Sequence, residues 1–506
     1  MGNFQLPSLQ VLLAFVAFMF MLLKIIRSSI LAATRGKKLP PGPRTLPIVG
    51  NLHQFMGESL PHQTMAKLAT KYGPIMHLKL GQVPTIVISS PEMAKQVLKT
   101  QDHIFASRPQ IIAAEIILYN FSIGFLPYGE TWRQIRKISV VEFLSPKRVL
   151  SFRPIREEEV SKIVEEISSN AGDPINLTVM LYKMMHEVLL RALIGKVDAQ
   201  GRYARLAAEI MKALGEYFLA DFFPSLKFLS ILTGQISKFK NLRKQGDEFL
   251  DYVIKERLEA RRKLSHTEAC KDGQEDFLHV LLDMLERGEF KSTDSVKATI
   301  QDLIVAGIDT SSTTLDWAMV EMVRHPSVLA KATEEVRAVF KKQGKVEEAQ
   351  LHQLKYMKLV IQETLRLHPP APMLIPRENT ETCEINGYEI SARSRILVNV
   401  WAINRDPNHW TKAGAFIPER FQENDIPFEH KGTHFHYLPF GSGRRMCPGI
   451  TYGLTMVQFT LASLLYNFDW KLPSGQKNED LRVDESFGLA IRRKEDFYVI
   501  PIPYNH

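Results

Sequence analysis

Cysteine is scarce in this chain. The 506 residues contain three, Cys270, Cys383 and Cys447. An odd number at such wide spacing argues against a framework of disulfides, and no Cys-x-x-Cys pair is present to hold a structural zinc ion. We therefore expect a reducing compartment, where each cysteine needs an explanation of its own.

Basic tracts with interleaved aromatic residues are also missing, although the formal net charge is +9. Without such a tract, nucleic acid is not expected as a partner, and the positive excess favours a membrane surface or an acidic protein. The content of 45% hydrophobic and 24% charged residues is typical of a folded globular protein. The sequence contains neither internal repeats nor low-complexity segments.

The N-terminus carries no charge before Lys24, and every residue from Val11 to Leu23 is apolar. A helix of about 20 residues spans roughly 30 Å, the thickness of the hydrocarbon core. A cleaved signal peptide is the alternative, but it usually starts with basic residues, which here follow the run. We predict that residues 1–27 anchor the chain once in the endoplasmic reticulum membrane, with the remainder in the cytosol.

Residues 28–50 are basic and proline-rich, and positions 39–43 read Leu-Pro-Pro-Gly-Pro. Prolines at this density exclude a helix and give a stiff, extended segment. It either orients the domain formed by residues 51–506 against the membrane or acts as a plain linker. Residues 220–232 are apolar and contain a proline, so they are either a membrane contact or a buried helix end.

The remaining pattern predicts a mainly α protein with small β-sheets, an α+β fold. Alternating apolar residues over 75–88 indicate a strand, a turn and a second strand. Apolar periodicity and charged stretches indicate helices, among which a long one ends just before Pro326. The predicted helices include 155–168, 237–264 and 295–324, a surface loop is expected near 265–276, and extended segments are expected near 383–400 and 480–503.

Residues 440–449 read Phe-Gly-Ser-Gly-Arg-Arg-Met-Cys-Pro-Gly. Proline is favoured in the first turn of a helix, and apolar residues recur at helical spacing from Ile450 onward. Cys447 is therefore expected at a helix N-terminus beside two arginines, conditions that lower the pKa of a thiol. A buried structural cysteine or a catalytic nucleophile is the alternative. The third glycine of a dinucleotide fingerprint is missing, so NADPH is not expected to bind here.

This loop resembles the haem-binding loop of the cytochromes P450, Phe-x-x-Gly-x-Arg-x-Cys-x-Gly. The resemblance implies haem b as cofactor, held between two long helices, and a thiolate ligand that favours cleavage of the O–O bond. It implies that Cys447 is the axial ligand of the iron and that Arg445 contacts a propionate. All five fixed residues of the motif are present: Phe440, Gly443, Arg445, Cys447 and Gly449.

Two further segments match the family and imply more haem contacts. Trp132 and Arg136 stand in a Trp-x-x-x-Arg pattern whose i,i+4 spacing points both side chains the same way. The resemblance implies that both residues bind propionates, as does Arg377, since guanidinium groups suit carboxylates. Each arginine could otherwise be a solvated surface charge.

Glu363 and Arg366 form the Glu-x-x-Arg pair of the family, and Arg420 lies in its Pro-Glu-Arg-Phe stretch. Alone, an i,i+3 pair on a helix surface would contribute only a few tenths of a kcal/mol. The resemblance implies that the three residues form a buried network with a structural role.

Within the long helix, residues 306–310 read Ala-Gly-Ile-Asp-Thr. Gly307 costs roughly 1 kcal/mol relative to alanine, so either close packing or an approaching ligand must account for it. The stretch resembles the oxygen-binding groove of the family. The resemblance implies that Ala306 and Gly307 leave room for O2, and that Asp309 and Thr310 relay protons to the distal oxygen atom.

Three mostly apolar segments match the substrate contacts of the family and predict a neutral, lipophilic substrate. Together the motifs resemble the plant microsomal A-type branch, clan 71, whose usual substrates make a terpenoid our first expectation. Phenolics, alkaloids or fatty acids are alternatives, as is an O2-independent isomerase or dehydratase, or a haem sensor. The predicted pocket residues are Ile112, Ile116, Phe121, Ala306, Gly307, Ala371, Met373, Leu374, Leu489 and Ala490.

Electrons must come from a partner, and the resemblance implies NADPH-cytochrome P450 reductase, an acidic flavoprotein. We expect a basic face near the haem to steer this partner electrostatically. Its predicted residues are Arg133, Arg136, Lys137, Lys147, Arg148, Arg444 and Arg445.

Overall fold

The structure is a computed structural model of the chain. It describes residues 38–198, 201–216, 219–226, 228, 233–264, 276–290, 292–423, 426–428 and 432–505. The predicted anchor, the first part of the basic segment, Cys270 and most of the expected loop at 265–276 lie outside these ranges. Across the described residues, no helix combines the length and the apolar character needed to cross a bilayer.

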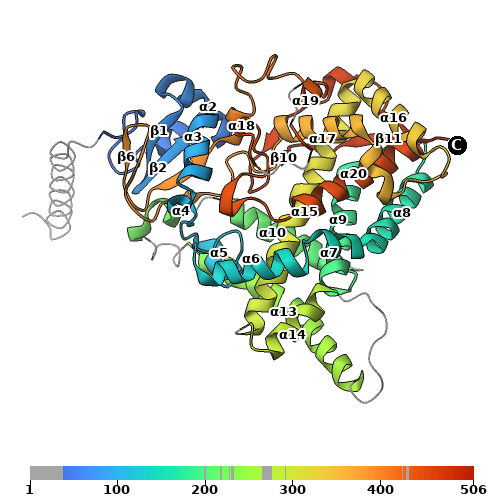
Figure 1. Ribbon diagram of the computed structural model, residues 1–506, viewed down its shortest axis with the longest axis horizontal. Coiled ribbons are helices and arrows are strands. Elements are labelled where there is room, and N and C mark those ends of the chain that lie inside the picture. The colour runs from blue at the N-terminus through green and yellow to red at the C-terminus, as the bar shows by residue number, and fades with distance from the viewer. Residues whose placement is uncertain are drawn as a thin grey trace, which may run out of the picture.

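Helices dominate the molecule, and a smaller β-rich region lies at one end (Figure 1). The predicted helices at 155–168, 237–264 and 295–324 are confirmed as α8, α13 and α15. The α-helices are α2 (Pro61–Tyr72), α3 (Pro91–Lys95), α4 (Asp102–Phe105), α5 (Ile112–Ile117), α6 (Glu130–Glu142), α7 (Pro146–Ser151), α8 (Arg153–Ser169), α9 (Leu177–Ile194), α10 (Arg202–Gly215), α11 (Leu219–Phe222), α13 (Gln235–Leu264), α14 (Phe277–Glu286), α15 (Thr293–Arg324), α16 (Pro326–Phe340), α17 (Lys355–Leu367), α18 (Val400–Ile403), α19 (Arg420–Glu423) and α20 (Ile450–Asn467).

The strands form small sheets, as predicted. A four-stranded sheet has the order β1-β2-β7-β4, and its central pair β2–β7 is parallel. A three-stranded sheet, β3-β11-β8, joins the C-terminal end of the chain to the helical body. The strands are β1 (Ile75–Leu80), β2 (Val83–Ile88), β3 (Ile175–Asn176), β4 (Arg377–Glu378), β5 (Cys383–Ile385), β6 (Tyr388–Ile390), β7 (Arg395–Val398), β8 (Phe468–Lys471), β9 (Glu485–Ser486), β10 (Arg492–Arg493) and β11 (Tyr498–Pro503).

The proline-rich segment packs on the first sheet. The carbonyl of Pro41 accepts a hydrogen bond from the backbone N–H of His77 in β1 at 2.9 Å. A Cβ atom on Gly42 would lie 2.0 Å from the carbonyl oxygen of His77, so glycine permits this close approach. The segment is therefore packed against the domain at residues 41 and 42, and its role toward the membrane stays a prediction.

The apolar stretch that starts at Ala220 begins as a buried helix end. Ala220 and Phe223 are buried, and the carbonyl of Phe222 accepts a hydrogen bond from the N–H of Gln82. This contact fixes α11 to the β1–β2 turn. Phe228 is exposed, and residues 229–232 lie outside the described ranges.

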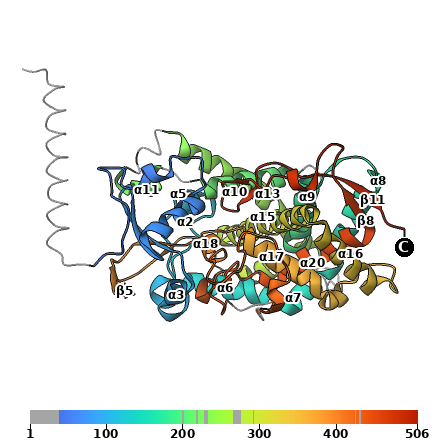
Figure 2. The same cartoon turned by 90° about the horizontal axis from the view of Figure 1, so that it is seen from above.

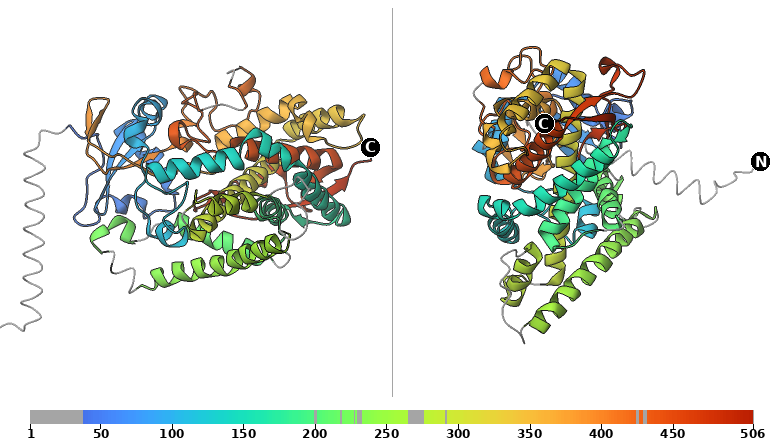
Figure 3. Two further views of the ribbon diagram at one scale, coloured as in Figure 1. Left: turned by 60° about the horizontal axis from the view of Figure 1, so that its bottom comes forward. Right: turned by 90° about the vertical axis from the view of Figure 1, so that its right-hand side faces the viewer.

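Helix α15 runs through the middle of the helical body, with α9, α17 and α20 packed around it (Figure 2). The Ser292 side chain caps its start by accepting from the N–H of Ser295. It ends at Arg324, because Pro326 cannot continue the hydrogen-bond ladder. By contrast, α13 and α14 project from one side of the body (Figure 3).

Candidate haem site

The loop before α20 has a left-handed backbone at two positions, which glycine adopts without strain. Gly441 and Gly443 have φ values of 66° and 72°, in the left-handed region. A Cβ atom on Gly443 would lie 2.1 Å from the carbonyl oxygen of Leu98. The N–H of Cys447 donates to the carbonyl of Phe440 at 3.0 Å and closes the loop. The glycines therefore let the loop turn tightly and place Cys447 just ahead of α20.

The predicted position of Cys447 is confirmed, because α20 begins at Ile450. The predicted low pKa of the Cys447 thiol is not found when only the surrounding protein groups act on it. Burial raises the pKa of the Cys447 thiol, although the backbone N–H of Gly449 and the positive charge of Arg136 both lower it. A coordinated metal ion deprotonates a thiol outright, so these two contacts would assist a metal-bound thiolate.

Four arginines crowd the interior next to this loop: Arg108, Arg136, Arg377 and Arg445. Burial and the positive charges of the other three lower the pKa of the Arg108 guanidinium well below its usual value. Burial and the charges of Arg377 and Arg136 lower the pKa of Arg445 to about 9. A buried charge is unfavourable unless an opposite charge pairs with it.

One carboxylate, Asp102, contacts this group: its Oδ1 lies 2.9 Å from Arg377, and its Oδ2 lies 3.1 Å from the more exposed Arg444. Positive charge remains in excess over this single carboxylate. The two propionates of haem would balance that excess, and Cys447 lies beside it to bind the iron. The residues present therefore fit haem.

The predicted propionate ligands also make contacts within the protein. Arg445 donates to the carbonyls of Ala106, Ile123 and Leu126, and its guanidinium lies 4.1 Å from the centre of the Trp132 ring. The Trp132 indole N–H donates to the carbonyl of Ile123 at 3.0 Å, and its contact with a propionate stays a prediction. Its ring packs beneath Arg445, so this contact positions the arginine.

The remaining cluster members are held in a similar way. Arg136 donates to the carbonyl of Met446 at 2.7 Å, and Arg377 donates to that of Ser442 at 2.9 Å. Arg108 was not predicted. It donates to the carbonyls of Gly124 and Pro376 at 2.9 and 2.8 Å. No motif or helical spacing indicated a role for Arg108. A possible signal was its position just before Pro109, a residue that cannot donate a backbone hydrogen bond.

The turn of α15 around residue 306 is accessible although its surroundings are buried. Ala306 is exposed and Thr310 half-buried, and both lie on one face of the helix at i,i+4 spacing. The Thr310 hydroxyl donates to the carbonyl of Ala306 at 2.8 Å. Asp309 is 2% exposed and pairs with Arg492. The accessible turn thus carries a hydroxyl with a carboxylate next to it in the chain.

Gly307 packs against a neighbouring helix. A Cβ atom there would lie 2.8 Å from Cδ1 of Leu189 on α9, at the end of a flexible side chain. The contact agrees with the close-packing explanation, and the approach of a ligand stays a prediction. Ala306, not Gly307, is the more exposed of the pair.

The predicted structural network is present. Arg366 donates to both carboxylate oxygens of Glu363, at 2.7 and 2.8 Å, and Arg420 donates to Glu363 at 3.1 Å. Glu363 and Arg366 are fully buried. Arg366 and Arg420 also donate to carbonyls of residues 404–415, so the network fastens α17 and α19 to the segment that precedes the Cys447 loop.

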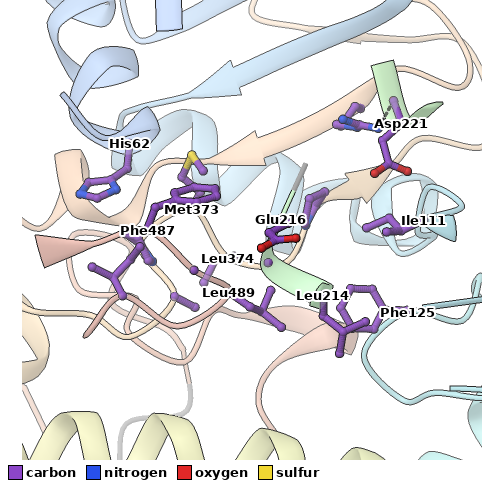
Figure 4. A pocket seen from close by; sticks show the side chains of 17 residues that line it. His62, Ile111, Phe125, Leu214, Glu216, Asp221, Met373, Leu374, Phe487 and Leu489 are labelled. Carbon is purple, nitrogen blue, oxygen red and sulfur yellow. Dashed lines mark hydrogen bonds between the residues drawn. The ribbon is translucent and has the colours of Figure 1, made fainter. Parts of the chain in front are cut away.

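A mostly apolar pocket opens between α10, the segment after α17 and the C-terminal loop (Figure 4). Four predicted substrate residues line it: Ala371, Met373, Leu374 and Leu489. Figure 4 shows Ile111, Phe125 and Leu214 on one side and Phe487 on the other. Polar groups also line it, namely His62, Glu216, Asp221 and Arg395.

The other predicted pocket residues do not line this cavity, and their contact with substrate stays a prediction. Ile112 is buried, because α5 turns it toward the core, while Ile111, at the N-cap of α5, lines the cavity. Ala490 is also buried. Phe121 borders a separate small depression. Ile116, Ala306 and Gly307 do not line the cavity either. Arg395 adds a cation outside the segments considered in the sequence, and it donates to the carbonyl of Asp221 at 3.0 Å.

Fewer residues of the predicted basic face are exposed than expected. Arg445 is 9% exposed and belongs to the buried arginine cluster, and Arg136 is half-buried against Met446. Arg148 is half-buried and donates to the carbonyl of Glu142. The members that remain exposed are Arg133, Lys137, Lys147 and Arg444.

Comparison with known proteins agrees with this geometry. The model of the family "Cytochrome P450" matches residues 40–498. The chain is 45% identical to premnaspirodiene oxygenase of Hyoscyamus muticus over 99% of both chains. It is 47% identical to melianol synthase CYP71BQ4 of Citrus sinensis, over 98% of this chain and 96% of that protein.

Tabersonine 16-hydroxylase 2 of Catharanthus roseus is 45% identical over 97% of each chain. A solved structure of a zebra fish cytochrome P450 with abiraterone superimposes with a TM-score of 0.74 at 23% identity. The match covers 88% of this chain and all of that one, and it shows the common fold. The chain therefore belongs to the cytochrome P450 family, in its plant A-type branch, and is a haem-dependent monooxygenase.

Proposed function

We propose that this monooxygenase hydroxylates a lipophilic plant metabolite, with O2 as oxidant and electrons from an NADPH-dependent reductase. The observation that carries the proposal is the accessible turn of α15, where Thr310 stands next to Asp309 in a fold that also presents Cys447 to a haem iron. An isomerase or dehydratase that rearranges a hydroperoxide needs no proton relay, so the intact pair favours oxygen activation.

Haem, when bound, supplies the iron at which O2 is reduced and its O–O bond is cleaved. Heterolytic cleavage requires two protons at the distal oxygen. The Thr310 hydroxyl donates its hydrogen to the carbonyl of Ala306. The lone pairs of Oγ1 can still accept a hydrogen bond from a water molecule and hold that water in place. Asp309 exchanges protons from its buried position behind this hydroxyl.

The substrate class follows from the pocket and from the relatives. The lining is dominated by aliphatic and aromatic side chains, which bind by apolar contact. Premnaspirodiene oxygenase and melianol synthase carry terpenoid names, and tabersonine 16-hydroxylase carries that of an alkaloid. A terpenoid is our first candidate. Arg395 and Glu216 add polar groups at the edge of the pocket that suit a substrate with one oxygen function.

The test is reconstitution of the full chain with haem, an NADPH-cytochrome P450 reductase and a panel of lipophilic metabolites. Premnaspirodiene, a triterpene alcohol, tabersonine, a phenolic and a fatty acid represent the candidate classes. We expect a low-to-high-spin shift and an NADPH-dependent hydroxylated product with a terpenoid. Turnover of a hydroperoxide in the absence of NADPH and O2 would contradict the proposed function.

The reductase docks on the exposed basic residues around α6, α7 and the Cys447 loop, and long-range attraction accelerates this encounter. Reduction of the haem by reductase should slow as ionic strength rises, and Lys137→Glu should slow it further at low salt. Lys212→Glu is the matched control, because α10 lies on the opposite side of the molecule (Figure 2). A rate that does not depend on salt would contradict the docking proposal.

The membrane arrangement is part of the same proposal. Residues 1–27 anchor the chain in the endoplasmic reticulum, and the domain from residue 51 onward lies in the cytosol. The apolar run and the basic residues that follow it support this topology. Protease treatment of intact microsomes should digest the catalytic domain, whereas a protected domain would contradict the cytosolic orientation.

A further inference from the structure

The C-terminal hairpin places pocket residues and charged residues next to one another. Strands β9 and β10 pair in antiparallel register, with Ser486 opposite Arg492 and Glu485 opposite Arg493. The loop between them, residues 487–491, supplies four of the residues that line the pocket. Its backbone is fixed on one side, where the N–H of Ile491 donates to the carbonyl of Pro370 at 2.9 Å.

The other side of this loop touches α10. A Cβ atom on Gly215 would lie 2.2 Å from the backbone nitrogen of Leu489, so the helix and the loop are in close contact. A substrate in the pocket between α10 and the loop therefore lies against the hairpin.

Polar contacts hold the hairpin at both strands. On β9, Glu485 accepts hydrogen bonds from His62 at 2.9 Å and from Gln63 at 3.1 Å, both on α2. On β10, the Arg492 guanidinium forms an ion pair with the Asp309 carboxylate on α15. Arg492 also lies over the ring of Tyr182 on α9, 5.1 Å from its centre. Arg492 thus bridges the hairpin to α15, which carries the accessible turn, and to α9, which packs against α15.

The ion pair is asymmetric in its burial. The Asp309 side chain is 3% exposed, whereas that of Arg492 is 37% exposed. A buried carboxylate without a partner would tend to take up a proton or turn toward solvent. Arg492 therefore places a positive charge next to the buried Asp309 carboxylate, and it does so from the strand that follows the pocket loop directly.

We propose that Arg492 is a positioning residue that holds Asp309 in place for proton delivery and links the pocket loop at 487–491 to that carboxylate. The proposal rests on the proposed relay role of Asp309. Movement of the loop on substrate entry would shift Arg492 and so change the pairing of Asp309. Proton supply at Thr310 would then depend on how the pocket is filled.

The experiment uses the full chain with haem and reductase, and O2 alone as the probe. Each NADPH provides two electrons, which reduce O2 with two protons to H2O2, or four electrons and four protons reduce it to two molecules of water. The ratio of H2O2 formed to NADPH consumed measures how often protons fail to reach the distal oxygen. Amide hydrogen exchange of residues 484–496 in the resting, haem-loaded protein reports on the hairpin without any turnover.

We expect Arg492→Gln to raise the H2O2 ratio severalfold and to speed amide exchange in the hairpin, while Arg492→Lys stays near the wild type. The matched control is Arg482→Gln, because Arg482 is an exposed arginine of the same segment whose ion pair with Glu495 is 3.6 Å long. It should match the wild type in both measurements. The carbon monoxide spectrum of every variant verifies that the haem site is intact.

Asp309→Asn separates the relay role of Asp309 from the positioning role of Arg492. If Asp309→Asn leaves the H2O2 ratio unchanged, the relay role falls and the role of Arg492 falls with it. If Asp309→Asn raises the ratio but Arg492→Gln does not, the relay stands and the role of Arg492 is refuted. Faster exchange in Arg492→Gln without a change in the ratio would make Arg492 a purely structural residue and would also overturn the proposal.

Discussion

The hydroxyl of Thr310 donates a hydrogen bond of 2.8 Å to the carbonyl oxygen of Ala306, one turn earlier in α15. This bond orients Oγ1 within the accessible turn and leaves its lone pairs able to accept. It also ties up the hydroxyl hydrogen, so proton transfer through Thr310 requires the hydroxyl to exchange this bond for one to a water molecule or to the bound oxygen.

Thr310→Ala should therefore lower product formed per NADPH by about tenfold or more and raise H2O2 release, because a positioned proton donor is lost. Product, NADPH and H2O2 measured in one reconstituted assay check this expectation. Thr310→Ser keeps the hydroxyl and should retain most of the coupling. Equal coupling in the alanine variant and the wild type would remove Thr310 from the relay.

Gly443→Ala should prevent normal assembly of the haem loop. The residue has φ = 72°, and the added Cβ atom would meet the carbonyl oxygen of Leu98 at 2.1 Å, a backbone atom that cannot move aside cheaply. Haem content per purified chain should fall well below that of the wild type. Gly414→Ala is the control, since a Cβ atom there meets nothing within 4 Å. Normal haem content in Gly443→Ala would show that the loop tolerates a different backbone.

Glu363→Gln should destabilise the protein by about 3–5 kcal/mol, because it leaves two buried guanidinium groups without their carboxylate. The free energy of unfolding from denaturant titration measures this effect. Glu166→Gln removes an exposed pair with Lys183, whose nitrogen and oxygen lie 3.4 Å apart, and should cost about 1 kcal/mol or less. Similar losses in the two variants would contradict a structural role for the Glu363 network.

Asp316 should give the stability a pH dependence. Burial raises the pKa of its carboxyl to about 6, although a hydrogen bond from Thr178 and the charge of Arg493 lower it. The folded state then holds a proton that the unfolded state has released, so stability falls as pH rises from about 4 to about 6. Above pH 6 the loss of stability caused by burying the Asp316 carboxylate stays constant.

Asp316→Asn should remove this deficit and stabilise the protein above pH 6 by up to about 3 kcal/mol, the equivalent of two pKa units. Below pH 4 the two proteins should unfold at the same denaturant concentration. Curves that stay parallel from pH 4 to pH 7 would show that Asp316 does not titrate in this range.

Local patterns predicted much of the fold and the centre of the site. The alternation at 75–88 specified β1 and β2, because a strand with one buried face must repeat every two residues. The prolines at 448 and 326 marked the start of α20 and the end of α15. Cys447 and Glu363 were predictable because their motifs combine residue type with fixed spacing.

Contacts between distant segments could not be read in the same way. Arg108 joins the arginine cluster through carbonyls more than 250 residues away, at Pro376, and no local pattern records that meeting. The partner of Asp309, Arg492, comes from a short hairpin near the C-terminus. In each case the tertiary packing decided the role.

The central claim is that the Cys447 thiolate holds the haem iron. The direct test is the spectrum of the reduced, haem-loaded protein under carbon monoxide, recorded for the wild type and for Cys447→His. We predict that the wild type shows the long-wavelength Soret band of thiolate-ligated haem and that the histidine variant loses it. A wild-type protein that is folded and haem-loaded but lacks this band would contradict the account.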